Sequence, residues 1–154
     1  RGLDDGVAEP SRRLARSRVT ETPWALSVLT VDDDEADASL IVEALRRNPR
    51  VRHAQAASDP NSALAQMLTG QWRPDLILLD IQMPVVDGFT FLRALREVPW
   101  LERTPVVFLT TSGYARDIAR AKETDISGYI VKPDTFSEMR DRINTVIQRF
   151  VLDS

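Results

Sequence analysis

The sequence predicts an α/β fold in which a five-stranded parallel sheet, doubly wound, carries helices on both faces. From residue 26 onward, short strand-like stretches alternate with stretches whose apolar residues repeat at helical spacing. Two strand candidates, LILL at 76–79 and VVFL at 106–109, are apolar at every position. Strands that are buried on both faces show this pattern, and they belong to parallel sheets that helices cover from each side.

The first half of the regular region alternates strand and helix signals. Apolar residues recur every three or four positions in the helical stretches, whereas the strand stretches are short and rich in valine, leucine and alanine. The second helix begins at Asp59 and Pro60, because aspartate caps a helix N-terminus and proline suits the first turn, and it ends at Gly70. The predicted elements are strand 26–31, helix 35–47, strand 51–57, helix 60–69 and strand 75–80.

The second half repeats the alternation and closes with an amphipathic helix. In that last helix, Phe136, Ile143 and Ile147 lie on one apolar stripe, as expected for a helix that packs on a sheet. The predicted elements are helix 87–97, strand 105–110, helix 114–123, strand 128–131 and helix 136–150.

Length and composition predict one domain with an N-terminal leader. The chain has 154 residues, of which 43% are hydrophobic and 28% are charged, so a single core can form. Residues 1–25 mix charges and prolines without periodicity. We expect a flexible leader over 1–25 and a folded domain over 26–151.

Charge and hydropathy exclude several classes of protein. The net charge of −3 argues against direct nucleic-acid binding, which calls for a basic surface. No apolar stretch is long enough for a membrane span, and the basic N-terminus lacks the apolar core of a secretory signal. The absence of cysteine excludes disulfides and thiolate metal sites. We therefore expect a cytoplasmic protein that binds neither membranes nor nucleic acid.

Charged and polar side chains stand where four of the predicted strands end. The carboxyl ends of parallel strands meet at one edge of a sheet, so these side chains should lie close together. Clustered carboxylates repel one another unless a cation lies among them, and oxygen ligands of this kind suit Mg²⁺. The residues are Asp32, Asp33 and Asp34 after the first strand, Asp80 at the end of the third, Thr110 at the end of the fourth and Lys132 after the fifth.

The same side chains match what phosphoryl transfer requires. Asp80, at a strand tip, can act as the nucleophile, and a carboxylate needs no separate general base. Negative charge on the transferred group calls for a cation and hydrogen-bond donors, which Lys132 and Thr110 supply. We therefore predict that Asp80 accepts a phosphoryl group in a Mg²⁺-dependent reaction.

Four segments carry a family resemblance: VDDD (31–34), LLDIQMPVVDG (78–88), FLTTS (108–112) and GYIVKP (128–133). They resemble the receiver domain of two-component response regulators, and the resemblance covers about residues 26–150. It implies the flavodoxin-like (βα)5 receiver fold and a metal site in which Asp33 and Asp80 bind Mg²⁺ directly, with Asp32 binding through water. The backbone carbonyl of Gln82 would supply a further oxygen.

The resemblance also implies roles in phosphorylation and switching. Asp80 would carry the phosphoryl group, and Lys132 would contact it. Thr110 would be the switch hydroxyl that moves toward the phosphoryl group, and Tyr129 the aromatic side chain whose rotamer follows. The peptide bond that precedes Pro133 is cis in the family. Phosphorylation is expected to change the surface formed by the last two helices and the strand between them.

The resemblance implies a phosphoacceptor switch with self-catalysed phosphorylation and dephosphorylation rather than an enzyme. Its donor would be a histidine kinase or a histidine phosphotransfer protein, and its output partner binding or homodimer formation. Only a few residues follow the predicted last helix, so we expect a single-domain regulator without an output domain, with a receiver fragment of a larger regulator as the alternative. A Mg²⁺-dependent aspartyl-phosphate hydrolase is less well supported, because Gln82 stands where those enzymes carry a second aspartate.

Overall fold

The predicted parallel sheet is present. The computed structural model describes residues 25–70, 72–83, 87–111, 119–121 and 123–153. Its five-stranded sheet has the order β2-β1-β3-β4-β5, and all neighbouring strands are parallel. The strands are β1 (Leu26–Val31), β2 (Val51–Ala57), β3 (Leu76–Asp80), β4 (Val106–Thr110) and β5 (Gly128–Val131).

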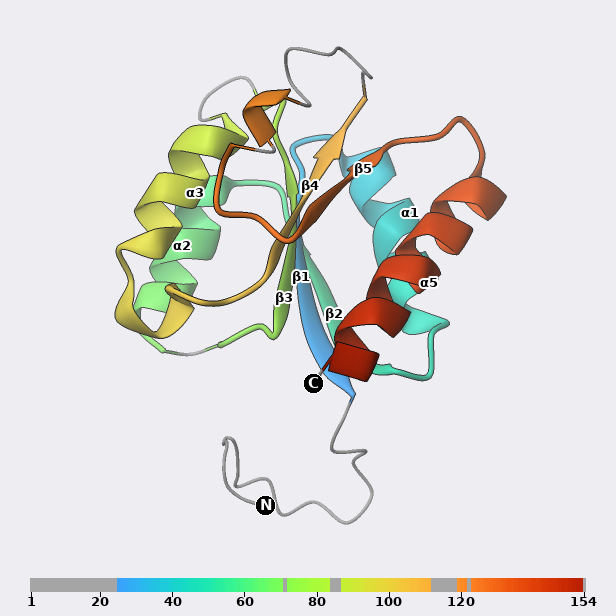
Figure 1. Cartoon of the computed structure of the whole chain (residues 1–154), viewed down its shortest axis with the longest axis horizontal. Coiled ribbons are helices and arrows are strands. Elements are labelled where there is room, and N and C mark those ends of the chain that lie inside the picture. Colours follow the sequence, from blue (N-terminus) through green and yellow to red (C-terminus); the bar gives the residue numbers. More distant parts are fainter. Residues whose placement is uncertain (1–24, 71, 84–86, 112–118, 122, 154) are drawn as a thin grey trace.

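Helices cover both faces of the sheet, as the apolar strands require (Figure 1). On one face lie α1 (Glu35–Arg46) and α5 (Phe136–Asp153), and on the other lie α2 (Pro60–Leu68) and α3 (Gly88–Arg96). Residues 119–121 are also helical. Within the described part of the chain, no helix is long and apolar enough to cross a membrane.

Two apolar cores lie on opposite sides of the sheet. Successive strand side chains point to opposite faces, so each central strand contributes to both cores. Val28 and Leu78 pack with α1 and α5, whereas Leu29 and Leu79 pack with α2 and α3. β1, β3 and β4 are buried along their whole length, which explains their uninterrupted apolar sequences.

Aspartate caps start three helices. Asp34 accepts hydrogen bonds from the amides of Ala36 and Asp37 at the start of α1. Asp59 caps α2 with Pro60 in its first turn, and Asp87 accepts from the Thr90 amide at the start of α3. A side chain that caps a helix satisfies amides that have no partner within the helix. These caps fix where each helix leaves the site edge of the sheet.

Some details differ from the sequence prediction. The 3-10 helix η1 (Pro99–Leu101) was not predicted, because three residues show no periodicity. The predicted leader falls outside the described residues except for Ala25, and so does most of the predicted helix 114–123. The bond between Lys132 and Pro133 is trans, so the cis bond implied by the resemblance is wrong for this structure. The free energies of the two isomers differ by only about 0.5–1 kcal/mol before proline.

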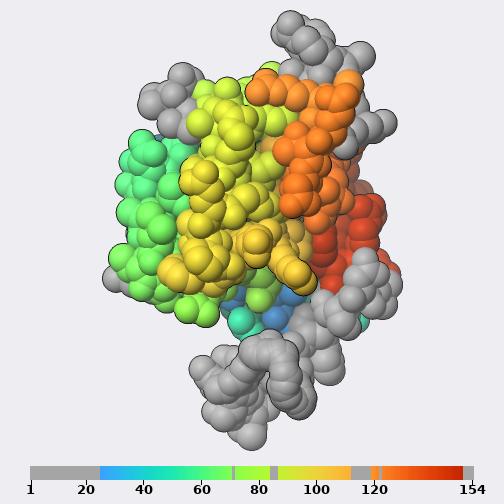
Figure 2. Space-filling model, turned by 60° about the vertical axis from the view of Figure 1, so that its left-hand side comes forward, coloured from blue at the N-terminus to red at the C-terminus, as the bar shows by residue number. Residues whose placement is uncertain are grey.

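Arg96 joins three segments at the far end of α3. Its guanidinium donates to the carbonyls of Leu101 at 2.9 Å and Thr104 at 2.7 Å, just before β4. It also donates to the Asp125 carbonyl at 3.1 Å, in the segment that leads into β5. Figure 2 shows this orange segment lying against α3. Arg96 therefore holds the connection before β5 to the α3 side of the domain.

Gly88 offers a test of the close packing beneath the predicted site. A Cβ at this position would lie 2.6 Å from the Cα of Ile81 and 2.9 Å from the carbonyl oxygen of Asp80. We expect Gly88→Ala to lower the free energy of unfolding by about 1–3 kcal/mol, because backbone must move to admit the methyl group.

Gly128→Ala is the matched control for chemical denaturation. Its added Cβ meets only the flexible Arg149 side chain, at 3.7 Å. Its free energy of unfolding should stay within about 0.5 kcal/mol of the wild-type value. Equal stability of the two variants would contradict the packing described for Gly88.

Candidate functional site

The strand ends bring four of the predicted site residues to one edge of the sheet. Asp32 follows β1, and its amide donates to the Ala57 carbonyl at the end of β2. Asp80 ends β3 and lies in register with Leu109 of β4. The Lys132 amide donates to the Thr110 carbonyl over 2.7 Å, which places the lysine beside the end of β4. The predicted convergence is confirmed for Asp32, Asp80, Thr110 and Lys132.

Three carboxylates form a compact acidic cluster at this edge. One oxygen from each of Asp32, Asp33 and Asp80 lies within 4.8 Å of the others. Asp32 and Asp80 are buried, whereas Asp33 is exposed. Carboxylates held this close favour a cation among them. The oxygen donors and the partly open position suit a hard divalent ion such as Mg²⁺.

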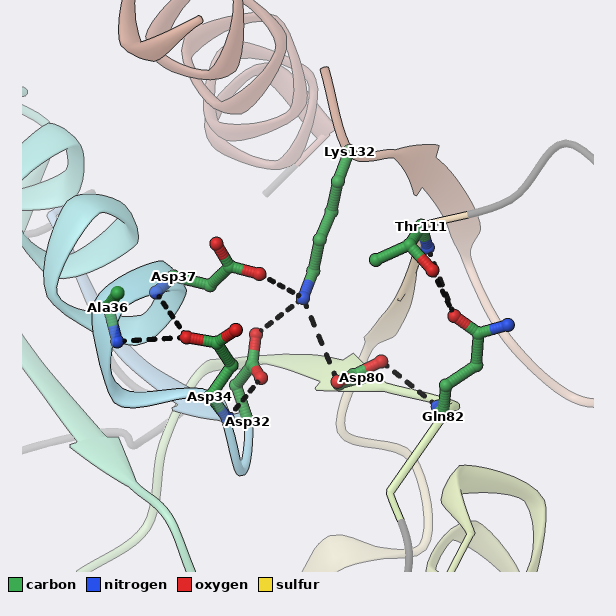
Figure 3. A network of polar contacts seen from close by, with 8 residues as sticks. All are labelled: Asp32, Asp34, Ala36, Asp37, Asp80, Gln82, Thr111 and Lys132. Carbon is green, nitrogen blue, oxygen red and sulfur yellow. Dashed lines mark hydrogen bonds and ion pairs between the residues drawn. The ribbon is translucent and has the colours of Figure 1, made fainter. Parts of the chain in front are cut away.

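The Lys132 ammonium lies between carboxylates from three segments (Figure 3). Its Nζ is 2.7 Å from Asp32, 3.0 Å from Asp37 and 3.7 Å from Asp80. The lysine side chain is only 6% exposed. Burial alone would lower the pKa of Lys132, but the hydrogen bond that Lys132 donates to Asp32 and the negative charges around it raise that pKa above its ordinary value. The lysine is therefore held in its charged form.

Burial governs the chemistry of Asp80. Asp80 is 3% exposed, and desolvation raises its pKa from 3.8 to about 6. The backbone amide of Gln82, which donates to Oδ1 of Asp80 over 3.0 Å, opposes this rise in pKa, as does the positive charge of Lys132. The nearby Asp32 adds to the rise. The carboxylate thus lies in an unfavourable environment without a further positive charge. A divalent cation would supply that charge.

Gln82 bridges the loops that follow β3 and β4. Its side-chain carbonyl accepts hydrogen bonds from the Thr111 hydroxyl and, over 3.3 Å, from the Thr111 amide. Figure 3 shows this contact beside Asp80. The backbone amide of Gln82 donates to Asp80, while its side chain is turned to Thr111. Sequence reasoning did not foresee this bridge, because the direction of a loop side chain depends on tertiary contacts.

The two predicted switch residues lie on the same face of the sheet. Thr110 is 2% exposed at the end of β4. Tyr129 is 36% exposed and pairs in register with Phe108, two residues before Thr110. Residues two apart along a strand point to the same face, so Tyr129 and Thr110 share the side that carries α2 and α3. The switching roles of Thr110 and Tyr129 stay predictions.

Asp37 is the site residue that sequence reasoning missed. It lies in the first turn of α1 and forms a hydrogen bond with Lys132 over 3.0 Å. The signal available in the sequence was its position, since Asp37 falls in the first turn of the predicted helix that directly follows Asp32, Asp33 and Asp34. Asp34, by contrast, serves as the predicted helix cap.

Comparison with known proteins now gives the class to which this fold and site belong. The family model for the response regulator receiver domain matches residues 28–144. A probable methanogenesis regulatory protein, FilR2 of Methanothrix harundinacea, is 30% identical over 132 residues, covering 83% of this chain and 85% of its own.

Solved structures agree with the family match. The phosphorylated cyanobacterial phytochrome response regulator RcpA superposes with a TM-score of 0.75 at 29% identity, covering 84% of this chain and 96% of its own. The Mn²⁺-bound response regulator Rcp1 gives a TM-score of 0.71 at 28% identity, covering 82% and 94%. The chain therefore belongs to the receiver domain family of response regulators, the phosphoacceptor switches of two-component signalling.

Relatives of this family differ in length. The chain spans most of FilR2 but less than half of several other curated relatives that it matches. The activities of these longer relatives therefore do not follow for this chain from the receiver match.

The raised pKa of Asp80 predicts a stability gain on removing its charge. Asp80→Asn keeps the shape of the side chain, and Lys132 keeps two carboxylate partners. In chelator at neutral pH, the free energy of unfolding should rise by roughly 1–3 kcal/mol, because the variant buries no third carboxylate.

The pH dependence follows from the direction of the shift. The folded pKa of about 6 exceeds the ordinary 3.8, so ionisation disfavours the folded wild type. The contribution of the Asp80 carboxyl to the free energy of unfolding of the wild type is fully present below about pH 4, and it is lost as the pH rises to about 6. The advantage of Asp80→Asn in urea denaturation should therefore vanish near pH 4. An advantage of the same size at both pH values would contradict the assignment.

Proposed function

We propose that this chain is a Mg²⁺-dependent phosphoacceptor switch in which Asp80 receives the phosphoryl group. The observation that carries the proposal is the position of the Asp80 carboxylate, which lies in an acidic cluster that calls for a cation and 3.7 Å from a buried ammonium. A cation bound among these carboxylates, together with the Lys132 ammonium, would stabilise a dianionic group on Asp80.

The proposed transfer is an in-line displacement at phosphorus. An oxygen of Asp80 attacks the phosphorus of a phosphohistidine, the new O–P bond forms, and the bond from phosphorus to the imidazole nitrogen breaks. The electron pair of the broken bond stays on the departing imidazole. Water later attacks the same phosphorus, which releases inorganic phosphate and restores the Asp80 carboxylate. Both steps need positive charge around the three equatorial oxygens.

The residues that would hold Mg²⁺ are those of the acidic cluster. Asp33 and Asp80 would bind it directly, Asp32 would bind through water, and the backbone carbonyl of Gln82 would supply a further oxygen. The exposed position of Asp33 leaves room for the waters that Mg²⁺ retains. A Mn²⁺ ion is bound in the similar regulator Rcp1. When present, the divalent ion neutralises charge on the acceptor and on the phosphoryl oxygens.

The proposed switch uses the groups that surround Asp80. Phosphorylation adds strong acceptor oxygens, which Lys132 and the Thr110 hydroxyl would satisfy. Movement of Thr110 would free space on the face that it shares with Tyr129, and Tyr129 would fill it. The surface of β5 and its flanking helices would change in consequence, altering partner binding or dimerisation.

The side chain of Gln82 favours an acceptor over a hydrolytic enzyme. An amide cannot serve as the general acid or base that repeated turnover needs. In this chain the amide oxygen of Gln82 is already bonded to Thr111. We therefore propose a histidine kinase or histidine phosphotransfer protein as donor, in the cytoplasm, and self-catalysed loss of the phosphoryl group.

Acetyl phosphate tests the proposed function without a cognate kinase. With Mg²⁺, intact mass should show one phosphoryl adduct on the wild-type chain, and chelation should abolish it. Asp80→Asn should abolish the adduct, because the amide is not a nucleophile, and Asp33→Asn should strongly reduce it by weakening the metal site.

The matched control is Asp34→Asn, next to the acidic pair. Asparagine caps a helix about as well as aspartate does, so α1 should persist and the adduct should form. An adduct of undiminished yield in Asp80→Asn, or one that forms equally well in chelator, would overturn the proposal.

A further inference from the structure

Among the described residues, one buried ammonium, that of Lys132, would have to serve both the carboxylates around it and the proposed phosphoryl group. Lys132 carries three N–H donors, and two of them reach the carboxylates of Asp32 and Asp37 at 2.7 and 3.0 Å. The Asp80 oxygen lies at 3.7 Å, beyond hydrogen-bond distance. Figure 3 shows Asp37 and Asp80 on opposite sides of the Nζ atom. In this conformation the lysine is held toward α1 and away from the proposed acceptor.

Asp37 differs from the other carboxylates around Lys132. It comes from the first turn of α1, and its backbone amide is fixed by the Asp34 cap over 3.1 Å. It lies outside the acidic cluster formed by Asp32, Asp33 and Asp80. Its side chain is 34% exposed, compared with 0% for Asp32. Water can therefore replace Lys132 as the partner of Asp37 more easily than as the partner of Asp32, because a buried carboxylate left without a partner is costly.

We propose that Asp37 is a positioning residue that competes with the phosphoryl group for Lys132. The inference rests on the proposed function and goes beyond it by adding a carboxylate from α1 that sets how strongly the site holds a phosphoryl group. While Lys132 is bonded to Asp37, part of its charge is neutralised and its donors point away from Asp80. A phosphoryl group at Asp80 has to draw the ammonium across the site.

The competition has a definite sign. Removing the Asp37 charge leaves Lys132 bonded to Asp32 and free to turn its remaining donors to an anion at Asp80. The substitution removes a charge-assisted hydrogen bond that the unphosphorylated protein makes in full and the phosphorylated protein makes only in part. It should therefore destabilise the unphosphorylated form more. Affinity for the phosphoryl group should then rise. Loss of a merely structural contact would lower it instead, because the site would become less ordered.

Beryllofluoride, a mimic of the phosphoryl group on aspartate, measures this affinity directly. At saturating Mg²⁺, Asp37→Asn should bind beryllofluoride about three- to tenfold more tightly than the wild type, the range expected for one partly exposed charge-assisted hydrogen bond. Asp37→Ala should shift in the same direction, which excludes an effect of the new amide. Titration calorimetry reads the binding, and urea denaturation verifies that each variant is folded.

Glu35→Gln is the matched control for simple charge removal. Glu35 lies in the same turn of α1, is exposed, and would lose the same charge. Its affinity should stay within about twofold of the wild-type value, since exposed charges at a distance are screened. An equal gain in Glu35→Gln, or an unchanged or weaker affinity in Asp37→Asn, would overturn the role of Asp37. Failure of the wild type to bind beryllofluoride with Mg²⁺ would instead overturn the proposed function, and this inference with it.

Discussion

The ion cluster around Lys132 is the constraint on which the site depends. A nearly buried ammonium contacts carboxylates from three separate segments, at 2.7 Å from Asp32, 3.0 Å from Asp37 and 3.7 Å from Asp80. Burying these charges has a desolvation cost that apolar side chains of similar size would not have. Stabilisation of the fold is therefore a poor explanation for the cluster. It is well explained as a site prepared for a cation and an anion that arrive from outside. The raised pKa of Asp80 is the sign of that preparation, because the carboxylate still lacks part of its counter-charge.

The fold supplies the rigidity that such a cluster needs. Apolar strands buried on both faces fix the ends of β1, β3 and β4 relative to one another, while the aspartate caps fix the starts of α1 and α3. The lysine follows β5, and its amide is bonded to the Thr110 carbonyl, so the ammonium and the switch hydroxyl are placed by the same pair of strands. Arg96 joins α3 to the segment before β5. A change near Asp80 would therefore meet packed elements that respond together.

The sequence predicts those parts of the site that follow from strand ends. Asp32, Asp80, Thr110 and Lys132 were found because alternation and apolar runs locate the strands, and parallel strands bring their carboxyl ends together. Asp37, the bridge from Gln82 to Thr111 and the three bonds of Arg96 could not be found in this way. Each depends on the direction of a side chain across two or three elements, which only tertiary packing decides. The short helix η1 was missed because three residues show no periodicity, and the trans bond before Pro133 differs from the cis bond that the family resemblance implied.

The most direct test of the account is to map the residue that becomes modified. After treatment with acetyl phosphate and Mg²⁺, borohydride reduces an acyl phosphate to an alcohol and so converts the modified aspartate to homoserine. Peptide sequencing by mass spectrometry then locates the change. The account predicts homoserine at position 80, with Asp32, Asp33 and Asp37 unmodified, because Asp80 ends β3 between the backbone amide of Gln82 and the ammonium of Lys132. Homoserine at another aspartate of the cluster, with position 80 intact, would contradict it.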